Sequence, residues 1–169
     1  MSVTEIFHQL TLTPTNIDRI AMPFPMSTRF IKLNDEWNAD PNVPKPAVSR
    51  SGNDVLLEFR LNPFQYKRFS EGDRGRLVFR NCWRYRLGGT NEEGWYLGQC
   101  RFSKIAPAWG EFYDVHGDLK LESSPDDWVL LGPEPQAPVK HFLFYLRDET
   151  FECDAGMVES LTVLPARRV

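Results

Sequence analysis

The sequence predicts a single-domain, mainly β protein: an antiparallel β-sandwich or a partly open barrel, with a short helical segment at the N-terminus. Three observations support this fold class. The chain has 169 residues, 41% of them hydrophobic, which is enough for one core. From Val55 onward apolar residues recur at every second position, which is the period of a β-strand. The 11 Gly and 13 Pro residues fall mostly between these apolar runs, which indicates short strands joined by turns.

The first part of the chain carries different signals. Ser2-Val3-Thr4-Glu5 fits a helix capping box, and Ile6 and Leu10 follow four residues apart, so we expect a short helical N-terminal segment within residues 1–25. Residues 34–54 are rich in Pro, Asn and Asp, which is typical of a surface connection. No shift in composition marks a second domain. We therefore expect one β-rich domain over residues 1–169.

The alternating runs define the expected strands. We expect strands at residues 55–61, 76–87, 95–102, 111–115, 128–131, 142–147, 150–155 and 158–164. Strands 76–87 and 95–102 are expected to pair as a hairpin across the Gly-containing loop 88–94. The short strand 128–131 is expected at the edge of a sheet, since Gly132 and Pro133 end it.

A second hairpin is expected from residues 142–147 and 150–155. One face of this hairpin is apolar and is predicted to be buried; it carries Phe142, Phe144, Leu146, Phe151, Cys153 and Ala155. The other face is predicted to be wetter and carries Leu143, Tyr145, Arg147, Thr150, Glu152 and Asp154. One buried face and one solvated face are typical of an antiparallel sheet.

The charge of the chain is unevenly distributed. The net charge of -3 makes general nucleic-acid binding unfavourable, because such binding needs a basic surface that neutralises phosphates. Residues 60–101 contain nine basic and four acidic residues, whereas residues 109–159 contain three basic and twelve acidic residues. These blocks are expected to complement each other within one molecule or between two copies of the chain in a homodimer. The alternative is an anion-binding face in the basic block.

Several classes of protein have no signal in the sequence. No apolar run reaches the roughly 20 residues that cross a bilayer, and the N-terminus lacks the basic start and apolar run of a signal peptide, so we expect a cytoplasmic protein with no membrane contact. The three cysteines (Cys82, Cys100 and Cys153) and three histidines (His8, His116 and His141) lack metal-ligand spacing. We therefore predict no metal and no cofactor.

The hairpin of residues 76–87 and 95–102 is the first candidate site. Pairing Leu87 with Trp95 would set Arg86 opposite Tyr96 and Arg84 opposite Gly98. The predicted ligand-binding residues are Arg80, Arg84, Arg86, Tyr96 and Gly98. A planar anion could meet a guanidinium and stack on a ring there. The alternative is that the arginines cover apolar surface and pair with the acidic C-terminal block.

The wetter face of the C-terminal hairpin is the second candidate site. Its predicted register sets Tyr145 opposite Glu152 and Leu143 opposite Asp154, with His141 at the start of the strand. Tyr145, Glu152, Asp154 and His141 are therefore candidate catalytic residues for general acid–base chemistry, provided that a pocket raises a carboxylate pKa. Ordinary polar pairs across two strands would explain the same residues.

The sequence carries no motif for a nucleophilic triad or a phosphate-binding loop. The leading hypothesis is therefore a non-enzymatic binding or protein-interaction module, whose partner is a small anionic ligand or another protein. The alternative hypothesis is a small β-fold enzyme that uses carboxylates for acid–base catalysis.

Overall fold

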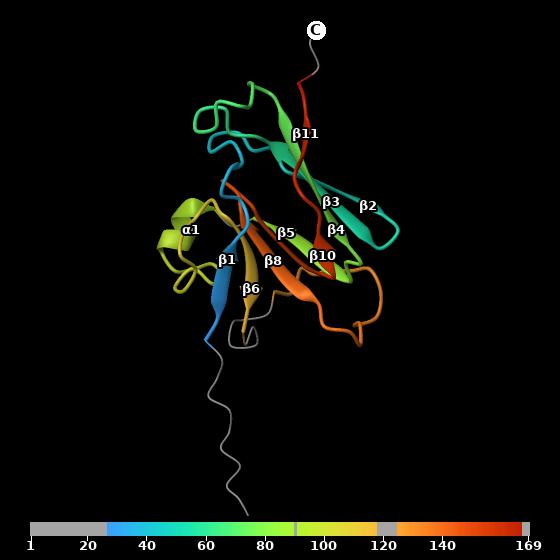
Figure 1. Cartoon of the computed structure of the whole chain (residues 1–169). Coiled ribbons are helices and arrows are strands. Elements are labelled where there is room, and N and C mark those ends of the chain that lie inside the picture. The colour runs from blue at the N-terminus through green and yellow to red at the C-terminus, as the bar shows by residue number, and fades with distance from the viewer. Residues whose placement is uncertain (1–26, 90, 118–124, 167–169) are drawn as a thin grey trace, which may run out of the picture.

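The computed structural model describes residues 27–89, 91–117 and 125–166. Its elements are β1 (Arg29–Lys32), β2 (Ala47–Ser51), β3 (Asp54–Arg60), β4 (Arg74–Arg80), β5 (Arg84–Gly88), α1 (Glu92–Tyr96), β6 (Phe112–His116), β7 (Val129–Leu130), β8 (Lys140–Tyr145), β9 (Thr150–Ala155), β10 (Met157–Val158) and β11 (Thr162–Leu164). One antiparallel sheet has the order β1-β6-β8-β9-β5-β7, and the other has the order β10-β4-β3-β2, with β11 also paired to β4 (Figure 1). The predicted mainly β fold is confirmed as two antiparallel sheets.

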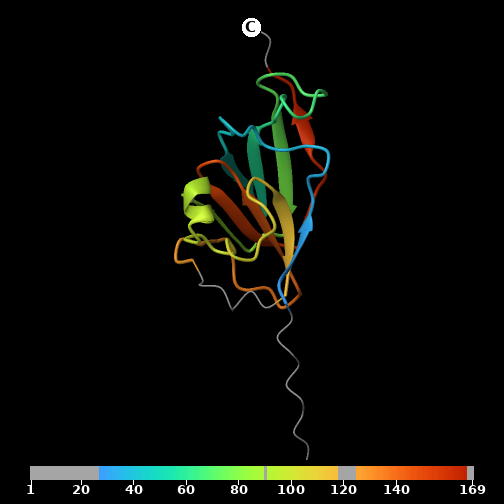
Figure 2. The same ribbon diagram turned by 90° about the vertical axis from the view of Figure 1, so that its left-hand side faces the viewer.

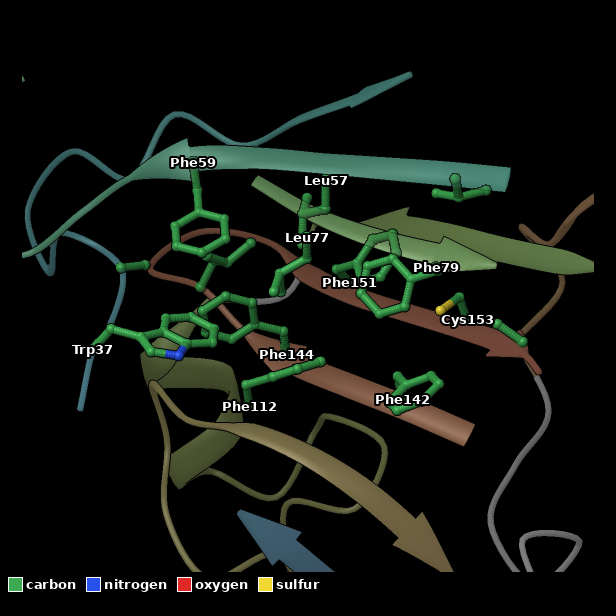
Figure 3. Close-up of a cluster of buried hydrophobic side chains, with 14 of the residues drawn as sticks. Trp37, Leu57, Phe59, Leu77, Phe79, Phe112, Phe142, Phe144, Phe151 and Cys153 are labelled. Atoms are coloured by element: carbon green, nitrogen blue, oxygen red, sulfur yellow. The ribbon is translucent and has the colours of Figure 1, made fainter. Parts of the chain in front are cut away.

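The main core lies between the two sheets. From the five-stranded sheet, β3 and β4 contribute side chains such as Leu57, Phe59 and Phe79. From the six-stranded sheet, the apolar face of β8 and β9 points toward them (Figure 3). All six residues predicted on this face belong to the buried cluster, so the prediction is confirmed: Phe142, Phe144, Leu146, Phe151, Cys153 and Ala155.

The region before β3 differs from the sequence-based expectation. The helix predicted within residues 1–25 lies outside the described residues. Residues 34–54 are more than a surface connection, because they contain β2 and the buried Trp37. The Trp37 ring stacks on Phe59 with centroids 5.5 Å apart, and Ala39 bridges to Leu61. Burial of this large ring outweighs the polar composition around it.

The predicted strand 76–87 is two strands in different sheets. Asn81 separates them with a φ of 52°, a left-handed conformation that Asn adopts more easily than most residues. As a result β4 lies in the five-stranded sheet and β5 in the six-stranded sheet. The predicted long strand is wrong. The alternation of apolar and polar residues continues through Asn81, although the left-handed conformation of this residue ends the first strand.

The predicted partner strand 95–102 is also wrong, because this segment is α1 followed by turns. Asn91 caps α1, and its side-chain oxygen accepts a hydrogen bond from the backbone N–H of Gly94 at 2.8 Å. Glu92 and Glu93 stand in the first turn, where acidic side chains are favourable. Without that partner, β5 pairs with β9 instead.

The face of β8 and β9 predicted to be wetter is buried. Leu143, Tyr145 and Glu152 are each 0% exposed. A second apolar cluster covers this face and consists of Phe102, Ala106, Tyr113, Val115, Leu143 and Tyr145, with Trp95 and Trp109 packed against it. In both views α1 lies on the six-stranded sheet, which is why this face does not reach solvent (Figures 1 and 2).

The C-terminal hairpin forms with a register that differs by two residues from the prediction. Tyr145 lies opposite Thr150 rather than Glu152, and a four-residue loop closes the turn, in which Leu146 donates its backbone N–H to Glu149 at 2.8 Å. A shift of two residues leaves every side chain on its predicted face.

Two further strand predictions fall at the edges of the sheets. β7 is an edge strand of the six-stranded sheet, as predicted for residues 128–131. The predicted strand 158–164 is interrupted, so that β10 and β11 pair with different parts of β4. Among the described residues, no helix has the length and apolar character required to cross a membrane.

Candidate functional site

The sheet order brings the two predicted sites together. β9 lies between β8 and β5, so Asp154 has His141 on one side and Arg84 on the other. Two residues along each strand, Arg86 lies opposite Glu152. We call the resulting group the β9 charge cluster; it consists of Arg84, Arg86, Arg101, Asp127, His141, Glu152 and Asp154.

Glu152 is the centre of the β9 charge cluster. One carboxylate oxygen accepts a hydrogen bond from Arg86 Nη1 at 2.7 Å. The other oxygen accepts from Arg101 Nη1 at 2.6 Å and lies 3.0 Å from His141 Nε2. Three basic side chains therefore compensate the charge of this carboxylate. The Glu152 side chain has no exposure to solvent, so its charge requires such partners.

His141 lies between two carboxylates. Its Nδ1 is 2.7 Å from Asp154 Oδ1, and its Nε2 is 3.0 Å from Glu152 Oε2. Deprotonated carboxylates only accept hydrogen bonds, so this geometry favours an imidazolium ring that donates from both nitrogens. Burial alone would lower the pKa of His141, but the hydrogen bonds to Asp154 and Glu152 and their charges raise it.

The two carboxylates have the protonation state that this arrangement requires. Burial alone would raise the pKa of Glu152, but the His141 hydrogen bond and the charges of His141, Arg101 and Arg86 lower it to about 2. The pKa of Asp154 is lowered against the effect of burial, first by the His141 hydrogen bond and then by charge. Neither carboxyl group holds a proton near neutral pH.

Of the four predicted acid–base residues, His141, Glu152 and Asp154 come together, whereas the Tyr145 hydroxyl is bound elsewhere. The Tyr145 hydroxyl donates to the backbone oxygen of Arg101 at 3.0 Å, and burial raises its pKa well above the usual value. His141, Glu152 and Asp154 have side chains that are 2%, 0% and 7% exposed. These three groups therefore present no reacting atom to solvent.

Arg84 is the most exposed arginine of the β9 charge cluster, and it is still held firmly. Its Nε donates to Asp154 Oδ2 at 2.5 Å. Its Cζ lies 4.5 Å from the centroid of the Trp83 ring and 4.3 Å from that of Trp128, so the guanidinium stands between two indoles. The side chain is 27% exposed, and within residues 27–89, 91–117 and 125–166 neither Nη atom has a hydrogen-bond partner.

The two indoles beside Arg84 also carry unsatisfied donors. The Nε1 atoms of Trp83 and Trp128 are buried and have no hydrogen-bond partner in the described part of the chain. A buried donor without a partner loses the free energy of its hydration. Among the described residues, the surroundings of Arg84 thus hold two N–H donors without a partner, whereas the acceptor Asp154 is already engaged.

The other predicted anion-binding residues are placed differently. Arg86 uses all three of its nitrogens, because Asp127 binds Nε and Nη2 while Glu152 binds Nη1. Arg80 lies in the five-stranded sheet and pairs with Asp54 and Glu159. The predicted register that set Arg84 opposite Gly98 is therefore wrong.

Tyr96 and Gly98 lie on the chain segment that covers the six-stranded sheet. Tyr96 is 69% exposed at the end of α1, and Gly98 follows with a φ of 73°. An added Cβ at Gly98 would meet the side chain of Lys104 at 3.2 Å. Tyr96 and Gly98 stand in a helix and a turn rather than in a strand beside β5.

Sequence reasoning missed the residues that complete the site. Arg101, Asp127, Trp83 and Trp128 were not predicted to contribute. Trp83 and Arg84 are neighbours, and so are Asp127 and Trp128, but no periodicity brings these two pairs together. Only the pairing of β5 with both β7 and β9 does so.

Comparison with known proteins gives no family assignment. No protein-family model matches the chain, and no curated protein and no solved structure shows a significant match. Within residues 27–89, 91–117 and 125–166, no group of three His, Cys, Asp or Glu side chains is arranged to hold a metal ion.

Proposed function

We propose that the chain is a non-enzymatic binding module, built as a β-sandwich, which binds a small oxyanion at Arg84. The observation that carries the proposal is the state of the guanidinium: Asp154 fixes Nε, the rings of Trp83 and Trp128 pack against the group, and neither Nη atom has a partner among the described residues. A guanidinium fixed in this way loses little side-chain entropy when an anion binds.

The chemistry of the surrounding atoms favours an anion over a cation or an apolar ligand. Two Nη groups can bind a carboxylate, sulfate or phosphate with two parallel hydrogen bonds. The indole rings of Trp83 and Trp128 pack against the guanidinium, and each ring carries a buried N–H group without a partner among the described residues. Asp154 is already neutralised by His141 and Arg84, which reduces its repulsion of a second anion.

A carboxylate enzyme has weaker support. General acid catalysis near neutral pH requires a carboxyl group with a raised pKa, whereas the pKa of Glu152 is lowered to about 2. General base catalysis by His141 requires a neutral ring, whereas the contacts of both ring nitrogens with carboxylates raise its pKa and favour the protonated ring. These residues are better explained as the support that holds Arg84 and Arg86 in place.

The test is binding of phosphate, sulfate and citrate to the wild type and to Arg84→Gln. The change in melting temperature is measured at constant ionic strength, because salts also change stability without a specific site. A ligand at 100 times its Kd should stabilise the wild type by about 2.7 kcal/mol and leave Arg84→Gln unaffected. Arg50→Gln is the matched control, since Arg50 is exposed on the edge strand β2 and makes no ion pair with a described residue.

A second measurement locates the bound anion. The indole N–H signals of Trp83 and Trp128 in a nitrogen–proton NMR spectrum should shift on addition of the anion that stabilises the wild type. The proposal is overturned if no anion stabilises the wild type, or if Arg84→Gln responds as the wild type does.

A further inference from the structure

A cleft of about 310 Å³ lies at the ends of several strands, and its described lining includes no residue of the β9 charge cluster. Its lining includes Asn38, Asp40, Asn62, Gln65, Trp109 and Tyr145. These residues come from the connection between β1 and β2, from the loop after β3, from the loop before β6 and from the end of β8. The volume falls at the lower end of the range for small-molecule sites, about 300–1,000 Å³.

Three polar side chains in this cleft are held in place by their own turns. Asn62 Oδ1 accepts hydrogen bonds from the backbone N–H groups of Phe64 and Gln65 at 3.0 and 3.1 Å. Asp40 Oδ1 accepts from two backbone N–H groups at 2.8 and 3.0 Å, and Asn38 Oδ1 accepts from Ala39 at 2.7 Å. Such bonds between a side chain and the backbone fix the rotamer of the side chain.

Each of these side chains keeps its second polar atom free. Within the described residues, Nδ2 of Asn38, Nδ2 of Asn62 and Oδ2 of Asp40 make no hydrogen bond. Asn62 is only 6% exposed, so its amide is an almost buried donor in the wall of the cleft. The cleft therefore presents donors and an acceptor in orientations that are fixed before any ligand binds, which favours binding.

An aromatic surface completes the cleft. The Trp109 ring stacks on Tyr145 with centroids 4.9 Å apart and an interplanar angle of 28°, while Trp95 packs against Trp109 at 6.2 Å. Tyr145 is buried, and the hydrogen bond of its hydroxyl to the backbone oxygen of Arg101 fixes its ring, so the ring is a rigid support for Trp109. An indole beside amide and carboxylate groups can contact the C–H face of a ring whose hydroxyls make hydrogen bonds.

The charges at the cleft are mixed and do not favour a simple ion as the ligand. Asp40 and Glu92 are acidic and would repel an anion, whereas Arg147 is basic and would repel a cation. Arg147 is also engaged, because its Nη1 donates to the backbone oxygen of Asn42. A neutral ligand whose groups both donate and accept hydrogen bonds fits this mixture.

We propose that this cleft is a second binding site, which takes a neutral polyhydroxylated ligand such as one unit of a saccharide. Each hydroxyl group donates one hydrogen bond and accepts two, so it can pair with Asn62 Nδ2 and with Asp40 Oδ2 alike. The apolar face of the sugar ring packs on Trp109. This site shares no ligand-binding residue with the proposed anion site at Arg84.

The test uses saturation-transfer NMR with D-glucose, D-galactose, D-mannose, N-acetyl-D-glucosamine and the disaccharides maltose and lactose. Each sugar is added at about 10 mM, which largely fills a site with a Kd of about 1 mM. The sugar that receives saturation is then titrated against the wild type and the variants, and its Kd is measured from the shifts of the protein signals.

The variants change the free atom and keep the turn. Asn62→Asp and Asn38→Asp retain the oxygen that accepts the backbone hydrogen bonds but replace the free donor with an acceptor. Asp40→Asn makes the reverse change. Each should weaken binding by about tenfold, since the hydroxyl that faces the changed atom must reverse its donor or acceptor role there and thereby gives up one of its other hydrogen bonds. Asn53→Asp is the control, because it makes the same chemical change in a turn outside the cleft.

The melting temperature of each variant shows whether it is folded, and Trp109→Phe provides a further variant that leaves the turns intact. Support requires that one sugar binds the wild type, that the cleft variants weaken it, and that Asn53→Asp does not. The proposal is overturned if no sugar in the panel binds, or if binding is unchanged in Asn62→Asp, Asp40→Asn and Trp109→Phe together.

Discussion

His141 Nδ1 lies 2.7 Å from Asp154 Oδ1, in a cross-strand pair buried on the outer face of the six-stranded sheet. The ring is held on its other side by Glu152, so the pair is part of a network of opposite charges rather than an isolated contact. Because Asp154 also fixes Arg84, the protonation of His141 and the position of the proposed anion site depend on the same carboxylate.

His141 is expected to be protonated at neutral pH. Its pKa in the folded protein is raised above the ordinary value of 6.5, so its contribution to stability is fully present below 6.5. That contribution is lost as the pH rises through the pKa of the folded state. Nitrogen NMR of the labelled imidazole should show two protonated ring nitrogens at neutral pH. A signal from an unprotonated ring nitrogen under these conditions would contradict the assignment.

Glu152→Gln should destabilise the fold strongly. The amide leaves Arg86, Arg101 and the His141 ring buried near a neutral group, and loss of one partner from a buried ion pair costs about 3–5 kcal/mol. Glu58→Gln is the matched control, since Glu58 pairs with Arg76 where both side chains are partly exposed, and it should cost about 1 kcal/mol or less. Urea denaturation measures both free energies of unfolding. Similar losses in the two variants would show that the buried network contributes no more than a surface pair.

The same carboxylate should make the protein sensitive to acid. The pKa of Glu152 is about 2 in the folded protein against 4.5 as its ordinary value, so its stabilising effect is present above 4.5 and is lost as the pH falls from 4.5 toward 2. The free energy of unfolding of the wild type should decline over this interval. A parallel decline in Glu152→Gln would show that other carboxyl groups cause it.

Periodicity predicted the faces of the β8–β9 hairpin because burial of alternate side chains is a local pattern. Phe142, Phe144 and Phe151 point to the core in any register shifted by an even number of residues. The register itself could not be predicted, since it depends on the closure of the four-residue loop at Leu146 and Glu149.

The candidate site could be predicted only in part, for physical reasons that involve distant segments. Arg84 and Asp154 are 70 residues apart in the chain. Their contact forms only because the chain passes at Asn81 from the five-stranded sheet to the six-stranded sheet. The signal for α1 was present in Asn91-Glu92-Glu93, an N-cap followed by acidic residues, but the glycines around it favoured a loop interpretation.

Phe144→Ala should cost about 3–5 kcal/mol of stability, the usual range for a buried aromatic residue. Phe144 is 0% exposed and contacts Phe59 edge to face at 5.2 Å, so its removal leaves a cavity between the two sheets. Phe64→Ala makes the same change at a side chain that is 63% exposed and should cost less than about 1 kcal/mol. Denaturation curves of the two variants compare core and surface directly.

Gly75→Ala should destabilise the junction of β3, β4 and the C-terminal segment. Gly75 lies opposite Phe59 in the β3–β4 pair, and a Cβ there would stand 2.9 Å from the Phe59 ring and 2.8 Å from Leu161 Cδ1. Both neighbours would have to move within a packed core, which costs about 1–3 kcal/mol. Gly132→Ala is the control, because its added Cβ would meet no atom within 4 Å and its backbone is not left-handed. Thermal unfolding of both variants checks the prediction, and an unchanged melting temperature for Gly75→Ala would mean that Phe59 and Leu161 can move aside without loss of packing.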